Sequence, residues 1–292
     1  MSRTLLLALF CALRAAAIQE ARGETLVRLK NTSTGYLLVP VFINESGPYP
    51  LLLDTGSTGT MICNDLLSSL AVPLGNETTV DSHTGAAGAQ AVKLGKIAIA
   101  DIGVADLEVV GVASLPSDLA RTGARGILGE DFLRHFDFLI DNRSHTLTLD
   151  LESNLLHRIA GEKLPLLPNG MGSNGGLPIV ELHLPDRFVS LRFLIDSGSN
   201  LGLVLTPPLT TFRGINPPSQ LHTLQGGSSC HLARVIPETS TSILPVFNMA
   251  ACQGLRADQK DVDGTVPTNT FDRVFVSYSG RFAVLNPDVR RP

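Results

Sequence analysis

The sequence LLLDTGSTG at residues 51–59 has a second version, FLIDSGSNL, at residues 193–201. In both, a run of apolar residues ends in an aspartate, Asp54 or Asp196, which a small hydroxyl residue, a glycine and a serine follow. Aspartate is rarely buried unless a partner holds it. Glycine lets the backbone turn sharply at this point, and hydroxyl groups can hydrogen-bond a carboxylate. The repeat therefore indicates two copies of one functional loop.

Three further elements recur in the same order around the two aspartates. An apolar segment precedes each motif, a glycine-containing segment follows it, and a strand–turn–strand segment closes each half. The pairs are residues 36–43 and 177–184, residues 85–88 and 226–227, and residues 135–149 and 271–285. Such repetition indicates a duplicated unit. Because the segments are short, apolar and separated by Gly and Pro, we expect an all-β fold of two duplicated lobes with a cleft between them.

The chain divides into four expected parts. Residues 1–22 contain an arginine near the start, an apolar stretch and three consecutive alanines, as signal peptides do. We assign residues 23–155 to an N-terminal lobe, residues 156–175, with their Gly and Pro, to a linker, and residues 176–292 to a C-terminal lobe. No later segment has the about 18 consecutive apolar residues of a membrane span. We therefore expect a secreted or periplasmic protein, with no stable membrane insertion after signal removal.

The composition argues against several classes of function. The 292 residues carry a formal net charge of −4, with 5% aromatic residues and no Trp, so nucleic acid is not an expected partner. The sequence has no Cys-x-x-Cys or His-Glu-x-x-His motif, so we expect no metal and no cofactor. Cys230 and Cys252 could form a disulfide in an oxidising compartment, or could stay buried thiols like Cys63, and the sequence leaves both open.

Two carboxyl groups on facing loops predict a specific chemistry. If Asp54 and Asp196 meet between the lobes, both cannot ionise cheaply, so they share one proton and titrate as a pair. One is then an acid and the other a base. Such a pair can deprotonate a water molecule for attack on a carbonyl group and protonate the carbonyl oxygen, which is general acid–base catalysis of amide hydrolysis.

The two motifs resemble those of the aspartic peptidases, the superfamily of pepsin-like and retropepsin-like enzymes. Its signature, two apolar residues followed by Asp-Thr/Ser-Gly-Ser/Thr, is present at residues 52–57 and again at residues 194–199. Its apolar-apolar-Gly element is similar to ILG at residues 127–129, and DFL follows at residues 131–133, as in bacterial retropepsin-like members. The resemblance implies that Asp54 and Asp196 are the catalytic dyad.

The resemblance also implies roles for the six residues beside the dyad. The hydroxyl residue after each aspartate would lock the two loops together across the lobe boundary. Each glycine would donate its backbone N–H to a carboxylate, and each final serine would bond an outer carboxylate oxygen. In that order, these residues are Thr55 and Ser197, Gly56 and Gly198, and Ser57 and Ser199.

The sequence departs from the family pattern at two places. The second half has DGTVP at residues 263–267 where an apolar-apolar-Gly element is expected, and no tyrosine lies between Tyr49 and Tyr278 to serve as a pepsin-like flap tyrosine. We expect instead one retropepsin-style flap in each lobe, in a monomer that resembles a fused retropepsin dimer. The expected substrate-binding flap residues are His83, Gly85, Gly88, Gly226 and Gly227.

The sequence thus predicts an aspartic endopeptidase whose partner is a polypeptide substrate bound in extended conformation. A catalytically inactive peptide-binding protein of the same fold is the main alternative, because the second half departs from the pattern. A glycosidase would also use two carboxyl groups, but it would want aromatic residues that stack on sugars. A homodimer built from first lobes is a further alternative that the second Asp motif makes unnecessary.

Overall fold

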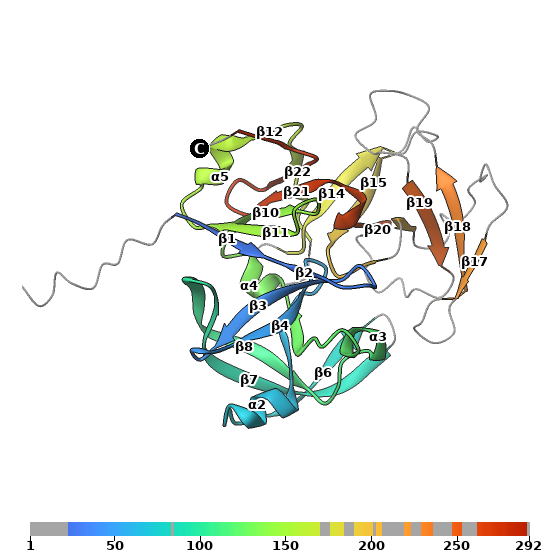
Figure 1. Ribbon diagram of the computed structural model, residues 1–292. Coiled ribbons are helices and arrows are strands. Elements are labelled where there is room, and N and C mark those ends of the chain that lie inside the picture. Colours follow the sequence, from blue (N-terminus) through green and yellow to red (C-terminus); the bar gives the residue numbers. More distant parts are fainter. Residues whose placement is uncertain are drawn as a thin grey trace, which may run out of the picture.

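The computed structural model describes residues 23–82, 85–169, 176–183, 190–200, 203–205, 219–222, 229–235, 247–252 and 262–290. The predicted signal peptide at residues 1–22 lies outside these ranges, as do His83, Gly226 and Gly227. The described residues form many strands and a few short helices, so the prediction of an all-β fold is confirmed. The strands make three large sheets, one for each half of the chain and one shared by both halves (Figure 1).

The first lobe is an eight-stranded sheet in the order β2-β3-β4-β9-β5-β8-β7-β6. In an additional pairing of β3 with β7, Phe42 lies opposite Ala98, so the sheet is strongly curved and partly closed. Side chains alternate between core and solvent as expected for a strand: in β7, Val92 and Leu94 are buried and Lys93 is exposed. The elements are β2 (Lys30–Asn31), β3 (Leu37–Ile43), β4 (Ser46–Leu53), β5 (Met61–Cys63), α2 (Asn64–Ser69), β6 (Glu77–Ser82), β7 (Gly85–Ile99), β8 (Ile102–Val112), α3 (Ser117–Ala120), β9 (Gly126–Leu128) and α4 (Glu130–Leu133).

The second lobe repeats the pairing pattern of the first in a seven-stranded sheet, β14-β15-β20-β16-β19-β18-β17. The strand that ends in the Asp motif pairs in parallel with a later strand in both lobes, β4 with β9 and β15 with β20. Its elements are β14 (Ile179–His183), β15 (Ser190–Asp196), β16 (Leu203–Leu205), β17 (Ser219–His222), β18 (Ser229–Val235), β19 (Phe247–Cys252), β20 (Gly264–Pro267) and η1 (Thr268–Thr270). The duplication read from the sequence is therefore also a duplication of topology.

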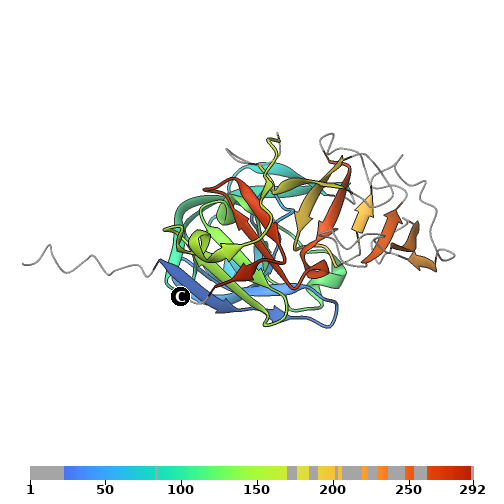
Figure 2. The ribbon, with the colours of Figure 1, turned by 90° about the horizontal axis from the view of Figure 1, so that it is seen from above.

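A six-stranded sheet joins the two halves, in the order β1-β11-β10-β21-β22-β13. At its centre, the closing hairpins of the two halves meet, and Leu139 of β10 lies opposite Phe275 of β21. In Figures 1 and 2 the strands of the second-lobe sheet lie to one side of this sheet. The strands are β1 (Glu24–Arg28), β10 (Asp137–Asp141), β11 (Thr146–Asp150), β13 (Leu164–Pro165), β21 (Arg273–Ser277) and β22 (Phe282–Leu285).

The segment predicted as a linker contributes to the sheets. Helix α5 (Asn154–Arg158) leads into β12 (Ile159–Ala160), which pairs with β23 (Asp288–Val289). Strand β13 then pairs with β22 and forms one edge of the shared sheet, as β1 forms the other. The connection between the lobes is therefore anchored at two points.

One hydrophobic core runs through both lobes. It contains Leu53 and Ile195, the residues immediately before the two aspartates, together with Phe138 and Val274 of the shared sheet. All four side chains are fully buried. The strands that end at the two Asp loops are thus packed into the same core, which fixes the loops relative to one another.

Candidate active site

The two Asp loops begin at equivalent places in the two lobes. Asp54 follows β4, and its backbone N–H donates to the carbonyl of Leu128 in β9 over 3.1 Å. Asp196 is the last residue of β15 and lies opposite Pro267 of β20. The DGTVP segment therefore takes the position expected for the apolar-apolar-Gly element, and its Val266 is fully buried.

Four hydrogen bonds connect the two loops across the lobe boundary. The backbone N–H of Thr55 donates to Ser197 Oγ over 3.0 Å, and the backbone N–H of Ser197 donates to Thr55 Oγ1 over 2.9 Å. Each hydroxyl in turn donates to a carbonyl of the opposite lobe, Thr55 to Ile195 over 2.8 Å and Ser197 to Leu53 over 2.7 Å. Both side chains are buried. Because every donor and acceptor is satisfied in one geometry, this network holds the two aspartates face to face.

The glycine of each motif serves both carboxyl groups. The N–H of Gly56 donates to Asp54 Oδ1 over 2.9 Å, and the N–H of Gly198 donates to Asp196 Oδ1 over 2.8 Å. A Cβ atom on Gly56 would lie 2.7 Å from Cγ of Asp196, and one on Gly198 would likewise overlap the carboxyl group of Asp54. Glycine at these positions is therefore what allows the two carboxyl groups to approach each other.

The two carboxyl groups interact directly. Burial raises the pKa of Asp54 well above its usual range, and the neighbouring charge of Asp196 and a hydrogen bond between the two side chains raise it further. The backbone N–H of Gly56 acts in the opposite direction by stabilising the carboxylate. Two carboxyl groups in this arrangement share one proton and titrate as a coupled pair.

The serines of the motifs lie in the loops, but not all in the role expected of them. Ser57 Oγ donates to the carbonyl of Gly59 over 2.8 Å, so it braces its own loop rather than an outer carboxylate oxygen. Ser199 lies partly exposed in the Asp196 loop.

Sequence reasoning missed a second carboxylate that braces the first loop. Asp131, in the first turn of α4, accepts from Thr60 Oγ1 over 2.6 Å and from Thr60 N–H over 2.9 Å. Thr60 Oγ1 also accepts from the N–H of Gly129 over 3.1 Å. Burial raises the pKa of Asp131 above its usual value. The available signal was an aspartate two residues beyond the ILG element, in the first turn of α4.

The expected first flap is an antiparallel hairpin of β6 and β7, in which Ser82 lies opposite Gly85 and Thr79 opposite Gly88. It is attached to the site through a second apolar cluster, which includes Ala89 of β7 and Leu52 of β4, two residues before Asp54. A pocket of about 570 Å³ lies along the hairpin. It is lined by Glu77, Thr78, Thr79, Gly88, Ala89 and Gln90.

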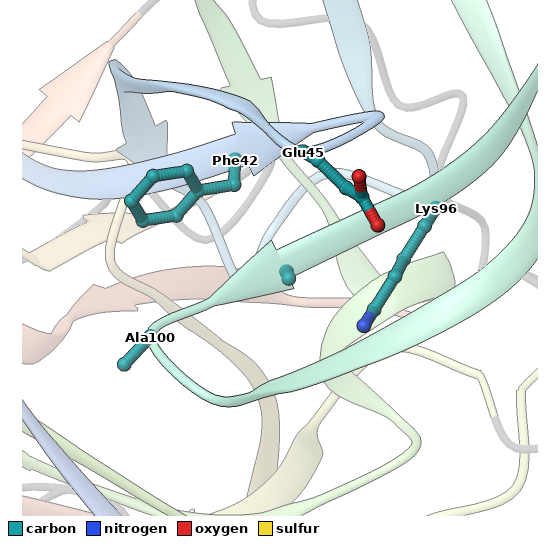
Figure 3. A pocket seen from close by; sticks show the side chains of 5 residues that line it. Phe42, Glu45, Lys96 and Ala100 are labelled. Atoms are coloured by element: carbon teal, nitrogen blue, oxygen red, sulfur yellow. The ribbon is translucent and has the colours of Figure 1, made fainter.

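A second pocket lies at the other end of the β3–β4 hairpin from Asp54. It measures about 180 Å³ and is lined by Phe42, Glu45, Lys96, Ala98 and Ala100 (Figure 3).

Among the described residues, no group of three or more His, Cys, Asp and Glu side chains is arranged to hold a metal ion. No helix in the described ranges is long and apolar enough to cross a membrane.

Comparison with known proteins agrees with the sequence motifs. Residues 39–132 match the aspartyl protease family, a range that contains the first Asp loop and the ILG element. A crystal structure of a retropepsin-like aspartic protease from Rickettsia conorii is similar over 43% of this chain and 90% of that one, with 15% identity and a TM-score of 0.34. No curated protein matches the chain. The resemblance of the first lobe to the aspartyl proteases is thus confirmed over residues 39–132.

Proposed function

We propose that this chain, which is similar to the aspartyl proteases, is an endopeptidase that uses Asp54 and Asp196 as its catalytic dyad. The observation that supports the proposal most strongly is the pair of Asp loops joined by reciprocal Thr55 and Ser197 hydrogen bonds. One chain supplies both loops, so we propose that the active species is a monomer.

The reaction would need one proton on the pair. The ionised carboxylate takes a proton from a water molecule held between the two side chains, and the resulting hydroxide attacks the carbonyl carbon of the scissile peptide bond. The protonated carboxyl donates its proton to the carbonyl oxygen. As the tetrahedral intermediate collapses and its C–N bond breaks, the carboxyl that received the water's proton passes it to the leaving amine, and the other carboxylate takes a proton from a hydroxyl of the intermediate, which restores the one-proton pair. The raised pKa of Asp54 suits this scheme because it favours the protonated form of one carboxyl in the pair.

The spacing of the carboxyl groups argues against glycoside hydrolysis. Glycosidases hold their two carboxyl groups about 5–9.5 Å apart, which leaves room for a sugar ring or a water molecule. Here Asp54 and Asp196 hydrogen-bond each other. A hydrogen-bonded pair of carboxyl groups fits peptide hydrolysis by a shared proton. The two carboxyl groups are too close together for the glycosidase geometry.

We further propose that the substrate is a polypeptide in extended conformation that lies under the β6–β7 hairpin. Extended peptides are bound through backbone hydrogen bonds to strands, with alternate side chains in pockets.

A complex peptide library tests the proposal when it is incubated with the full chain between pH 3 and 7. We expect cleavage that a pepstatin-like transition-state mimic blocks and that both Asp54→Asn and Asp196→Asn abolish. Circular dichroism spectra equal to the wild type's would show that the variants fold. Binding of the mimic without cleavage at any pH would instead identify a peptide-binding protein of the same fold.

A further inference from the structure

The turn at residues 32–36, between β2 and β3, is held in one conformation by its own hydrogen bonds. The N–H of Tyr36 donates to Thr32 Oγ1 over 2.9 Å, and the N–H of Thr32 donates to the carbonyl of Tyr36 over 2.9 Å. Gly35 adopts a φ of 84°, in the left-handed region that glycine enters without strain. The turn is therefore a rigid element of the first lobe.

Tyr36 anchors this turn to the first lobe beside the candidate active site. Its side chain is buried, and its hydroxyl donates to Oδ2 of the buried Asp118 in α3 over 2.7 Å. Burial, this hydrogen bond and the charge of Asp118 raise the pKa of Tyr36, and the charges of Asp54 and Asp196 add smaller effects in the same direction. The phenol thus lies within electrostatic range of both dyad carboxyl groups.

The second lobe binds this turn through Asn200, four residues after Asp196. Nδ2 of Asn200 donates to the carbonyl of Thr34 over 2.9 Å. The side chain of Asn200 also packs close to Gly35, since an ideal Cβ on that glycine would lie 3.8 Å from Cβ of Asn200. The loop that carries Asp196 therefore rests on a first-lobe element at a point separate from the Thr55–Ser197 network.

The two Asp loops differ in how their own lobes support them. Position 58, the first-lobe equivalent of Asn200, is an exposed threonine, and the first loop is braced within its lobe by Asp131 and the N–H of Gly129. The parallel registers make Pro267 the equivalent of Gly129. Proline has no N–H to donate. The N–H that donates to Thr60 in the first loop thus has no counterpart at Pro267.

We propose that Asn200 and the turn anchored by Tyr36 and Asp118 form a second clasp between the lobes, and that Asn200 and Tyr36 are positioning residues for Asp196. The clasp adds a contact from the first lobe to the support that Gly198 of the second lobe gives Asp196. The proposed effect on turnover rests on the peptidase function proposed above, whereas the clasp itself can be measured without turnover.

The test compares Asn200→Ala and Tyr36→Phe with the control Glu108→Gln, at an exposed position of β8. In an active wild type, we expect both clasp variants to lower kcat about 10-fold with KM changed less than about twofold, because a small displacement of a reacting group costs rate rather than binding. The control should match the wild type. Asn200→Asp should lose rate at neutral pH and recover below pH about 4, where its protonated carboxyl can again donate to the carbonyl of Thr34.

Hydrogen exchange of the peptide at residues 193–200 provides the readout without activity. We expect faster exchange in Asn200→Ala than in Glu108→Gln at equal melting temperature. Equal kcat and equal exchange in these two variants would overturn the clasp. A wild type that never cleaves peptide, with faster exchange only in Asn200→Ala, would leave the clasp in place and overturn the peptidase function.

Discussion

Asp54 and Gly198 face each other across the boundary between the two lobes, and the carboxyl group of Asp54 fills the space that a side chain at residue 198 would need. The relationship is reciprocal, since Gly56 faces Asp196 in the same way. Each lobe therefore provides one aspartate of the pair, and its glycine leaves the space that the aspartate of the other lobe occupies. Neither half of the chain can form this arrangement alone.

Gly198→Ala should abolish peptide hydrolysis while the chain still folds. The added methyl group would overlap the carboxyl of Asp54, so the two loops must separate, and a shift of about 1 Å can cost two orders of magnitude in rate. Turnover of the library substrate measures the effect. A control is Glu108→Gln, at an exposed position of β8. Equal activity of the two variants would contradict the tight facing geometry.

The dyad should make the wild type less stable as pH rises. The pKa of Asp54 is higher in the folded chain than the about 3.9 of an unfolded one, so between these values the folded state binds more protons. The free energy of unfolding then falls as pH rises through that window. Urea unfolding at several pH values measures the slope, which Asp54→Asn should reduce. An unchanged slope in the variant would argue against a pair that shares a proton.

Thr55→Val should destabilise the chain by about 2–4 kcal/mol, because valine keeps the shape of threonine but leaves the buried N–H of Ser197 without its acceptor. Removing the hydroxyl also takes the donor from the carbonyl of Ile195. Chemical denaturation measures the loss. Thr58→Ala, an exposed threonine in the same loop, should change stability by less than about 0.5 kcal/mol.

Asp131→Asn should lower both stability and turnover. Asp131 accepts from the N–H and from the hydroxyl of Thr60 with different oxygens, and asparagine replaces one of these acceptors by a donor. We expect a loss of about 1–3 kcal/mol in the free energy of unfolding. Glu108→Gln, at an exposed position of β8, is the matched control. A variant as stable and as active as this control would show that Thr60 needs no carboxylate.

Cys230 and Cys252 should form a disulfide under oxidising conditions. They are direct partners in the β18–β19 pairing, and Cα atoms of such partners lie about 4.5–5.5 Å apart, within the range of disulfides. Peptide mapping by mass spectrometry without reductant should find the two peptides linked. Full alkylation of both thiols in protein refolded under an oxidising glutathione buffer would contradict the pairing.

Much of the fold could be predicted because its signals are local. The apolar runs at residues 36–43 and 51–53 carry the strand pattern within a few residues, and they form the hairpin of β3 and β4. The function of the loop at Asp54, Thr55 and Gly56 could be predicted in the same way, because turn geometry and hydrogen-bonding capacity depend on the residue types themselves. The second motif at residues 196–199 then follows by repetition.

The contacts that join distant segments could not be predicted. Leu139 lies opposite Phe275, and the linker residues of β13 pair with β22, although a two-residue strand has no periodicity to detect. Pro267 fits below Asp196 without matching the expected motif, because a parallel strand needs the right backbone position rather than a particular side chain.

The sequence by itself determined the duplicated all-β lobes, the two Asp loops and the chemistry that those loops can perform. Only the tertiary structure decided that Ser57 braces its own turn, that Asp131 holds Thr60, and that Asn200 reaches Thr34 of the other lobe. The physical reason is that strand and turn preferences act over a few neighbouring residues, whereas the partner of a side chain depends on which surfaces meet after the sheets have packed.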